Sequence, residues 1–189
     1  MLNLSDKSNL SLRILSIDPG TVNLGSCFAV GDFGKKTFTV NYAKTFSIER
    51  LIDHTNVYKT ETYSTNISMA YSVYALMRDL LTHFEPDWVI CESPYLNSMF
   101  PVSYAKLTIC AQAIQEAVKD HRFSLPFFFI DPSSVKKGVG VKGNDGNKAS
   151  MYTAVTNTPD IIKGINISHL DEHSIDAIAV GYGAFKYIS

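Results

Sequence analysis

The sequence lacks any apolar stretch long enough to cross a membrane or to direct secretion. No hydrophobic run approaches the roughly 20 residues needed to span a bilayer. The polar N-terminus, Met1 to Ser11, has no apolar part like that of a signal peptide. Internal repeats and low-complexity tracts are also missing. We therefore expect a protein that works inside a cell, with no membrane partner.

Cysteine is scarce, and its spacing matches no common cysteine-based site. The three cysteines, Cys27, Cys91 and Cys110, lie in apolar surroundings and form no CxxC pair. Redox motifs and structural zinc sites use closely spaced cysteines. The three thiols are therefore predicted to be reduced residues of the core.

An excess of charge of either sign is also absent. The 189 residues sum to a formal charge of −1, with 46% hydrophobic and 19% charged residues. This composition is typical of a globular protein, and the length suits one α/β domain. A nucleic-acid partner would need a basic face that is local.

What is present is a pattern of strands followed by alternating helices and strands. Alternating or fully apolar segments predict strands at about residues 12–17, 24–30, 36–46, 88–91 and 126–130. Apolar residues at helical spacing predict helices at about residues 65–84, 101–120, 147–155 and 171–187. Residues 47–64 are polar and are predicted to form a long connection or insertion.

The order of these elements predicts an α/β fold with a five-stranded mixed sheet. Three strands with short connections are typical of an antiparallel meander. The segments 88–91 and 126–130 are fully apolar, which favours parallel strands buried on both faces. Helices should therefore cover both faces of the sheet.

Acidic residues stand at the ends of these predicted strands. Asp18 ends the first strand, Glu92 directly follows the segment 88–91, and Asp131 follows the segment 126–130. On the last helix, His173 and Asp176 share one face because they are three residues apart. If the strands are neighbours, these groups can meet at one edge of the sheet.

Such a cluster of oxygen ligands with one imidazole suits Mg²⁺, and Mn²⁺ as a substitute. Two such ions would activate water and stabilise the leaving oxygen in phosphodiester hydrolysis. Each acid alone also has an ordinary structural explanation, since a strand-end Asp often caps a turn and an acid at a helix start is stabilised by the helix dipole.

Four ordered motifs resemble the RuvC family of Holliday-junction resolvases, which has the RNase H-like fold. They are IDPGTVNLG from Ile17, EPDWVICESPY from Glu85, DPSSVKKGVGVKGNDGNKASM from Asp131 and DEHSIDAIAVGYGAF from Asp171. The resemblance implies one nuclease domain over residues 12–189 after an N-terminal extension, residues 1–11.

The resemblance also implies roles for individual residues. Asp18, Glu92, His173 and Asp176 would be the catalytic, metal-binding set, and metal binding would require His173 to be unprotonated. Tyr95 and, as a second candidate, Phe100 would stack on an unpaired base of the junction. An equally open alternative is that Tyr95 anchors its own loop.

The basic, glycine-rich segment would contact the DNA backbone. Its lysines are Lys136, Lys137, Lys142 and Lys148, which could also neutralise charge that develops at phosphorus. The alternative is a flexible, solvated loop. For Asp131, which precedes this segment, we prefer a capping role.

The activity that the resemblance implies is resolution of four-way DNA junctions by paired nicks that leave 5′-phosphate ends. Paired cuts imply a homodimer that binds branched DNA and needs no small-molecule cofactor. The N-terminal extension and the long segment from Ser47 to Ser64 depart from bacterial members. These departures indicate a phage, viral or otherwise divergent protein, in the cytoplasm or at the nucleoid.

Three other functions remain open at this point. A nuclease of the same fold acting on RNA–DNA hybrids or flaps would share the acids. A junction-binding protein without catalysis is another possibility, and the retained acids argue against it. An actin-like ATPase or sugar kinase also begins with a strand, Asp, Gly and Thr, but it needs two such domains and a second phosphate loop.

Overall fold

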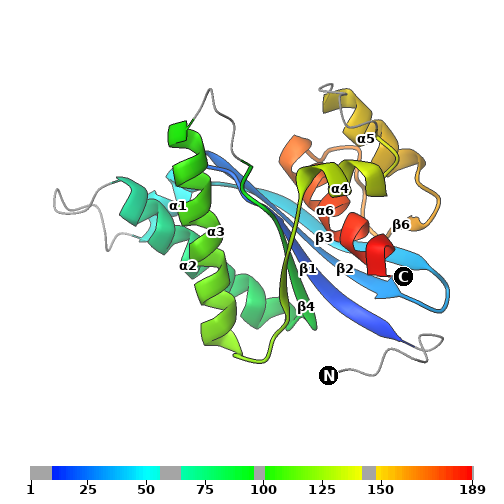
Figure 1. Ribbon diagram of the computed structural model, residues 1–189, viewed down its shortest axis with the longest axis horizontal. Helices are drawn as coiled ribbons and strands as arrows, with labels where there is room; N and C mark the ends of the chain where they lie inside the picture. The colour runs from blue at the N-terminus through cyan, green and yellow to red at the C-terminus, as the bar shows by residue number, and fades with distance from the viewer. Residues whose placement is uncertain (1–9, 56–64, 96–100, 142–147, 189) are drawn as a thin grey trace.

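The computed structural model of the chain contains a six-stranded mixed sheet (Figure 1). It describes residues 10–55, 65–95, 101–141 and 148–188. Across the sheet the strand order is β5-β4-β1-β2-β3-β6. The strands are β1 (Ser11–Asp18), β2 (Asn23–Asp32), β3 (Thr37–Ser47), β4 (Trp88–Glu92), β5 (Phe127–Ile130) and β6 (Ile161–Lys163).

The strand directions confirm the expected combination of an antiparallel meander and parallel strands. β1, β2 and β3 pair antiparallel in chain order. β4 then pairs parallel to β1, and β5 pairs parallel to β4. At the opposite edge β6 pairs parallel to β3. The carboxyl ends of β1, β4 and β5 therefore meet at one edge of the sheet.

Helices cover both faces of the sheet, as expected (Figure 1). Helices α1, α2 and α3 lie on one face, and α4, α5 and α6 lie on the other. Their bounds are α1 (Ile48–Thr55), α2 (Thr65–Phe84), α3 (Pro101–His121), α4 (Pro132–Gly138), α5 (Lys148–Asn157) and α6 (Glu172–Ile188).

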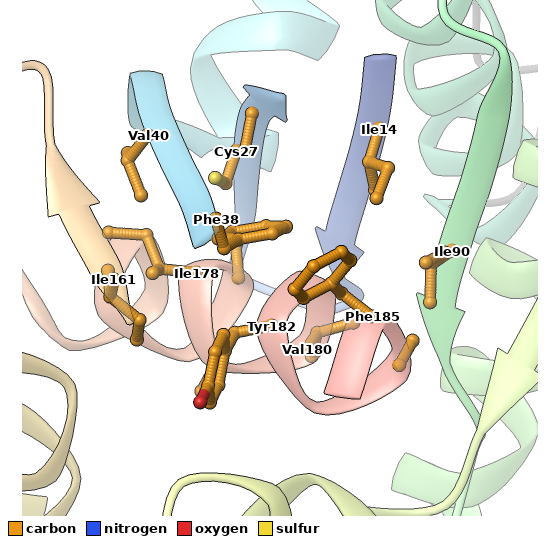
Figure 2. Close-up of a cluster of buried hydrophobic side chains, with 14 of the residues drawn as sticks. Ile14, Cys27, Phe38, Val40, Ile90, Ile161, Ile178, Val180, Tyr182 and Phe185 are labelled. Atoms are coloured by element: carbon orange, nitrogen blue, oxygen red, sulfur yellow. The ribbon is translucent and has the colours of Figure 1, made fainter. Parts of the chain in front are cut away.

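Helix α6 forms the centre of one hydrophobic core. Figure 2 shows side chains of the strands, such as Ile14 and Phe38, directed toward α6, which contributes Tyr182 and Phe185. From Ser174 to Phe185 the helix is buried almost throughout, apart from a partly exposed Asp176. Burial of this length of helix stabilises its position on the sheet and so locates its first turn.

The opposite face holds a second core that α2 and α3 share with β1 and β4. Cys91 and Cys110 belong to this core and Cys27 to the other, and all three are buried and free. Burial raises the pKa of Cys27 and of Cys110 to about 12, so these thiols stay protonated and unreactive. The expectation of reduced core cysteines is thus confirmed.

Several expected boundaries need correction. The sheet has six strands where five were predicted, because β6 adds a three-residue edge strand. Residues 48–55 form helix α1, so they are not part of a long connection, and residues 56–64 lie outside the described part. Helix α4 occupies the start of the basic segment, which was not predicted as a separate helix.

Strand β5 is an edge strand, and the expectation that it is buried on both faces was wrong. Phe128 and Phe129 are 42% and 45% exposed. Their rings still pack on neighbours, Phe128 against Trp88 and Phe129 against Phe127. By contrast, four of the five residues of β4 are buried, as expected for a strand between β1 and β5. Within the described residues, no helix is long and apolar enough to cross a membrane.

Candidate active site

Two carboxylates emerge together at the carboxyl ends of neighbouring parallel strands. Asp18 is the last residue of β1 and Glu92 is the last residue of β4. The register places Ile17 opposite Cys91, so the two acids follow at the same level. Asp18 is only 8% exposed and Glu92 is partly buried. The predicted meeting of these two acids at one sheet edge is confirmed.

The first turn of α6 brings His173 to the same edge. Its ring atom Nδ1 lies 3.1 Å from Oδ2 of Asp18. The other ring nitrogen, Nε2, lies 3.7 Å from Oε1 of Glu172. The hydrogen bond to Asp18 raises the pKa of His173 above its ordinary value of 6.5, and partial burial opposes this shift. Protonated His173 is therefore favoured by its contact with Asp18.

Glu92 lies where its negative charge is disfavoured. Burial raises the pKa of Glu92 from its ordinary value of 4.5 to about 8, and the nearby charges of Asp18 and Asp176 add to the shift. The charge of Lys136 acts to lower the pKa of Glu92 but does not offset the other effects. A carboxyl group whose ionisation is this unfavourable gains from a bound cation. The shift also places Asp176 in electrostatic range of Glu92, as predicted.

The side chains at this edge are of the kinds that bind a divalent cation with a preference for oxygen ligands. Three carboxylates and one imidazole are the ligands that Mg²⁺ and Mn²⁺ accept in proteins. The structure does not present them as a finished ligand shell. Among the described residues, no three His, Cys, Asp or Glu side chains form a group that could already hold one ion. Metal binding would therefore require these side chains to reorient.

Gly25 allows α6 to approach the sheet at this point. It lies opposite Asp18 in the pairing of β1 with β2. A Cβ atom at Gly25 would overlap the backbone carbonyl of His173 and would lie 3.3 Å from the Cβ of Asp18. The missing side chain thus makes room for the first turn of α6 beside Asp18.

Gly25→Ala is therefore expected to displace this turn and to lower the free energy of unfolding by about 2 kcal/mol. Urea denaturation measures the loss. Gly140→Ala is the control, because Gly140 has a φ of 81° and no described residue lies within 4 Å of an added Cβ. The control should lose about 1 kcal/mol from backbone strain alone. Wild-type stability in Gly25→Ala would contradict the close approach.

A second set of contacts ties the start of α6 to β3. Thr45 donates a hydrogen bond to Asp171, and the hydroxyls of Thr45 and Ser174 lie 2.8 Å apart. Asp171 also accepts a hydrogen bond from the backbone N–H of Ser174, at 3.0 Å. Burial acts to raise the pKa of Asp171, but the hydrogen bonds from Thr45 and Ser174 outweigh it and the pKa falls. Asp171 therefore acts as an ionised cap of α6.

Helix α4 presents Lys136 to the acidic site. Asp131 precedes this helix and accepts a 2.9 Å hydrogen bond from the backbone N–H of Ser134, which confirms the expected cap. Hydrogen bonds from Ser133 and Ser134 lower the pKa of Asp131 to about 2. Lys136 is partly buried and acts on the charge of Glu92, whereas Lys137 is exposed.

The other predicted DNA contacts are only partly within the described residues. Tyr95 is 70% exposed, three residues after Glu92, so its ring is free to meet a base. Lys148 begins α5, but its side chain lies outside the described part. Phe100 and Lys142 also lie outside the described residues.

Three residues that contact the site were given no role by the sequence analysis. They are Gly25, Thr45 and Glu172. The motif that contains Gly25 could have marked it, because a glycine inside a strand signals a close backbone approach. No comparable signal marks Thr45, since its partners are 126 and 129 residues away in the sequence.

Sequence comparison alone does not place this chain. No protein-family model matches it, and no curated protein matches it by sequence. Similarity to solved structures is extensive. RuvC of Thermus thermophilus, in complex with a Holliday junction substrate, shares 16% identity at a TM-score of 0.68, with 95% of both chains covered. The chain has the RuvC fold.

Two further structures extend this RuvC-like similarity beyond bacteria. The yeast mitochondrial Holliday junction resolvase shares 17% identity at a TM-score of 0.68, with 93% of this chain and 78% of that chain covered. The fowlpox virus resolvase, in complex with Holliday junction DNA, shares 16% identity at a TM-score of 0.50, with 93% and 98% covered. The expected RNase H-like fold is thereby confirmed.

Proposed function

We propose that this protein is a metal-dependent endonuclease that resolves four-way DNA junctions. The observation that carries the proposal is the meeting of carboxyl groups at the edge of a RuvC-like sheet, where burial and the charges of Asp18 and Asp176 oppose the ionisation of Glu92. Partly buried carboxyl groups that oppose one another's ionisation are costly in a protein that does not bind cations. Nucleases that use two metal ions need such a cluster.

In this proposal Asp18, Glu92, Asp176 and His173 hold one or two Mg²⁺ ions, or Mn²⁺ in their place. The bound metal would supply an activated water and stabilise the leaving oxygen. The water oxygen bonds to phosphorus and the bond from phosphorus to the 3′ oxygen breaks, which leaves a 5′-phosphate and a 3′-hydroxyl. His173 contributes as a neutral imidazole, so a metal ion competes with the proton that Asp18 favours there.

The basic and aromatic residues around the acids would bind the DNA. Lys136 would neutralise charge on the phosphate next to Glu92, and Lys137 would bind the backbone from an exposed position. Tyr95 would stack on an unpaired base near the branch point. Because resolution requires cuts in two strands, we propose that two copies act as a homodimer whose symmetry matches that of the junction. Such a protein would work where branched DNA is found, at the nucleoid or in the cytoplasm of a host cell.

Replacement of each of the two neighbouring lysines should change a different quantity, the cleavage rate or the affinity for the junction. Lys136→Gln is expected to lower the cleavage rate at saturating junction on the order of tenfold to a hundredfold, because Lys136 lies beside the acidic site. Lys137→Gln should weaken junction binding and reduce its salt dependence, with little change in the saturated rate. Single-turnover kinetics on a labelled junction measure both quantities. Equal effects of the two variants on the saturated rate would contradict the placement of Lys136.

A substrate panel tests the proposal against the other nucleases of this fold. The purified protein is incubated with a four-way junction, a Y-fork, a flap and an RNA–DNA hybrid, each with Mg²⁺ or Mn²⁺. The proposal predicts preferential nicking of the four-way junction. Cleavage of the hybrid or the flap in its place would assign the protein to another branch of the fold. Tight junction binding without any cleavage would indicate a binding protein.

A further inference from the structure

Asp18, Gly25 and Thr45 form a row across three strands. Asp18 pairs with Gly25, and Gly25 pairs with Thr45. Residues directly opposite one another in antiparallel strands project from the same face of the sheet. Both outer members contact α6, Asp18 through His173 and Thr45 through Asp171 and Ser174. The first turn of α6 therefore lies between two side chains, over a glycine.

The hydroxyl of Thr45 makes two contacts with this turn. It has a single proton, which it donates to the carboxylate of Asp171. The hydroxyl of Ser174 lies 2.8 Å from that of Thr45, within hydrogen-bond distance. Ser174 is 2% exposed, so water cannot easily replace this partner. The residues that Thr45 holds lie on either side of His173, at positions 171 and 174.

We propose that Thr45 is a positioning residue for His173, and this inference rests on the proposed metal-dependent function. Thr45 fixes the rotation of the first turn of α6 about its axis through Asp171 and Ser174. Gly25 sets the depth to which the turn approaches the sheet. Because the rotation and the depth of the first turn of α6 are both fixed, the His173 ring is directed at Asp18. Asp176 follows three residues later, on the same face of the helix as His173. Residues that orient a metal ligand typically change metal affinity by about 10–100-fold when they are replaced.

Thr45→Val tests this role because valine keeps the shape of threonine and removes the hydroxyl. Titration with Mn²⁺ alone, followed by electron paramagnetic resonance, measures metal affinity without catalysis. We expect the dissociation constant to rise about 10–100-fold. Thr45→Ser keeps the hydroxyl and should restore affinity to within about threefold of the wild type.

Thr39→Val is the matched control on the same strand. Thr39 lies between Phe38 and Val40, which both face the core around α6, so its side chain projects from the other face. This variant should keep wild-type Mn²⁺ affinity. The inference is overturned if Thr45→Val folds and binds Mn²⁺ like the wild type, or if Thr39→Val loses as much affinity.

A measurement on the metal-free protein separates this inference from the proposed function. The ¹H–¹⁵N signals of the His173 ring report its hydrogen bond to Asp18 directly. Thr45→Val should shift them and Thr39→Val should not. If the wild type binds no Mn²⁺ and cuts no DNA, the proposed function fails while the ring signals still decide the role of Thr45. Unchanged ring signals in Thr45→Val would overturn the inference even for an active nuclease.

Discussion

Asp18→Asn is expected to abolish cleavage of a four-way junction and to leave junction binding intact. The replacement keeps the size of the side chain and an oxygen that can accept a hydrogen bond from His173. It removes the negative charge of the most buried acid of the site, which is 8% exposed. Loss of a ligand charge should slow cleavage at least about 10³-fold, or about 4 kcal/mol of transition-state stabilisation. Binding should persist because the lysines that we propose as contacts to the DNA backbone are unchanged.

Asp32→Asn is the matched control for this variant. Asp32 also ends a strand, but it lies at the other end of the sheet, opposite Ser11, and pairs with Lys35 at 3.1 Å. Its replacement should leave cleavage unchanged. Single-turnover cleavage and a gel-shift assay on the same junction measure the two activities. An Asp18→Asn variant that retains more than about a tenth of the wild-type cleavage rate would show that Asp18 is not a metal ligand.

Glu92→Gln is expected to make the metal-free protein more stable and insensitive to Mg²⁺. In the wild type the pKa of Glu92 is raised by burial and by Asp18 and Asp176, from 4.5 to about 8. The unfolded chain therefore releases this proton at a lower pH than the folded protein does. Between these two values the folded state binds more protons, so its stability falls as the pH rises. Between these two pH values we expect the free energy of unfolding to fall by about 3 kcal/mol. This figure is smaller than the full pKa shift would give, because Glu92 is partly exposed and solvent screens its charge.

Glutamine at position 92 has no proton to lose, so its stability should stay nearly constant over the same window. Urea denaturation with a chelator, at the two ends of the window, measures the difference. Millimolar Mg²⁺ should then stabilise the wild type at the upper end and leave Glu92→Gln unchanged. Glu116→Gln, on the exposed face of α3, should behave like the wild type. A wild type whose stability rises through this window would contradict the raised pKa of Glu92.

The fold was predictable because apolar patterns are local. The five strands and four helices that the sequence predicted all exist, with ends shifted by a few residues. The pattern failed where an element is short or lies at an edge. β6 has only three residues, Ile161 to Lys163, which is too few for alternation to register. In β5 the run of apolar residues was taken as a sign of full burial, but β5 is an edge strand of the described sheet.

The acids of the site were predictable because strand ends and helix faces can be read from sequence. The role of Thr45 was not, because it depends on an irregularity between β2 and β3. The register shifts between Phe28 and Ala29, so Tyr42 and Val40 are the paired partners there and Asn41 is passed over. Val40 faces the core around α6, and strict alternation would put Thr45 on the opposite face. The irregularity reverses this and turns Thr45 toward α6.

The most direct test is cleavage of a four-way junction beside a linear duplex of the same sequence. Both substrates are labelled on two strands and incubated with the purified protein and Mg²⁺. We expect paired nicks near the branch point of the junction, with 5′-phosphate ends, and no cuts in the duplex. Equal cutting of both substrates, or intact junctions at protein concentrations that saturate binding, would contradict the assignment of this RuvC-like chain as a junction-resolving nuclease.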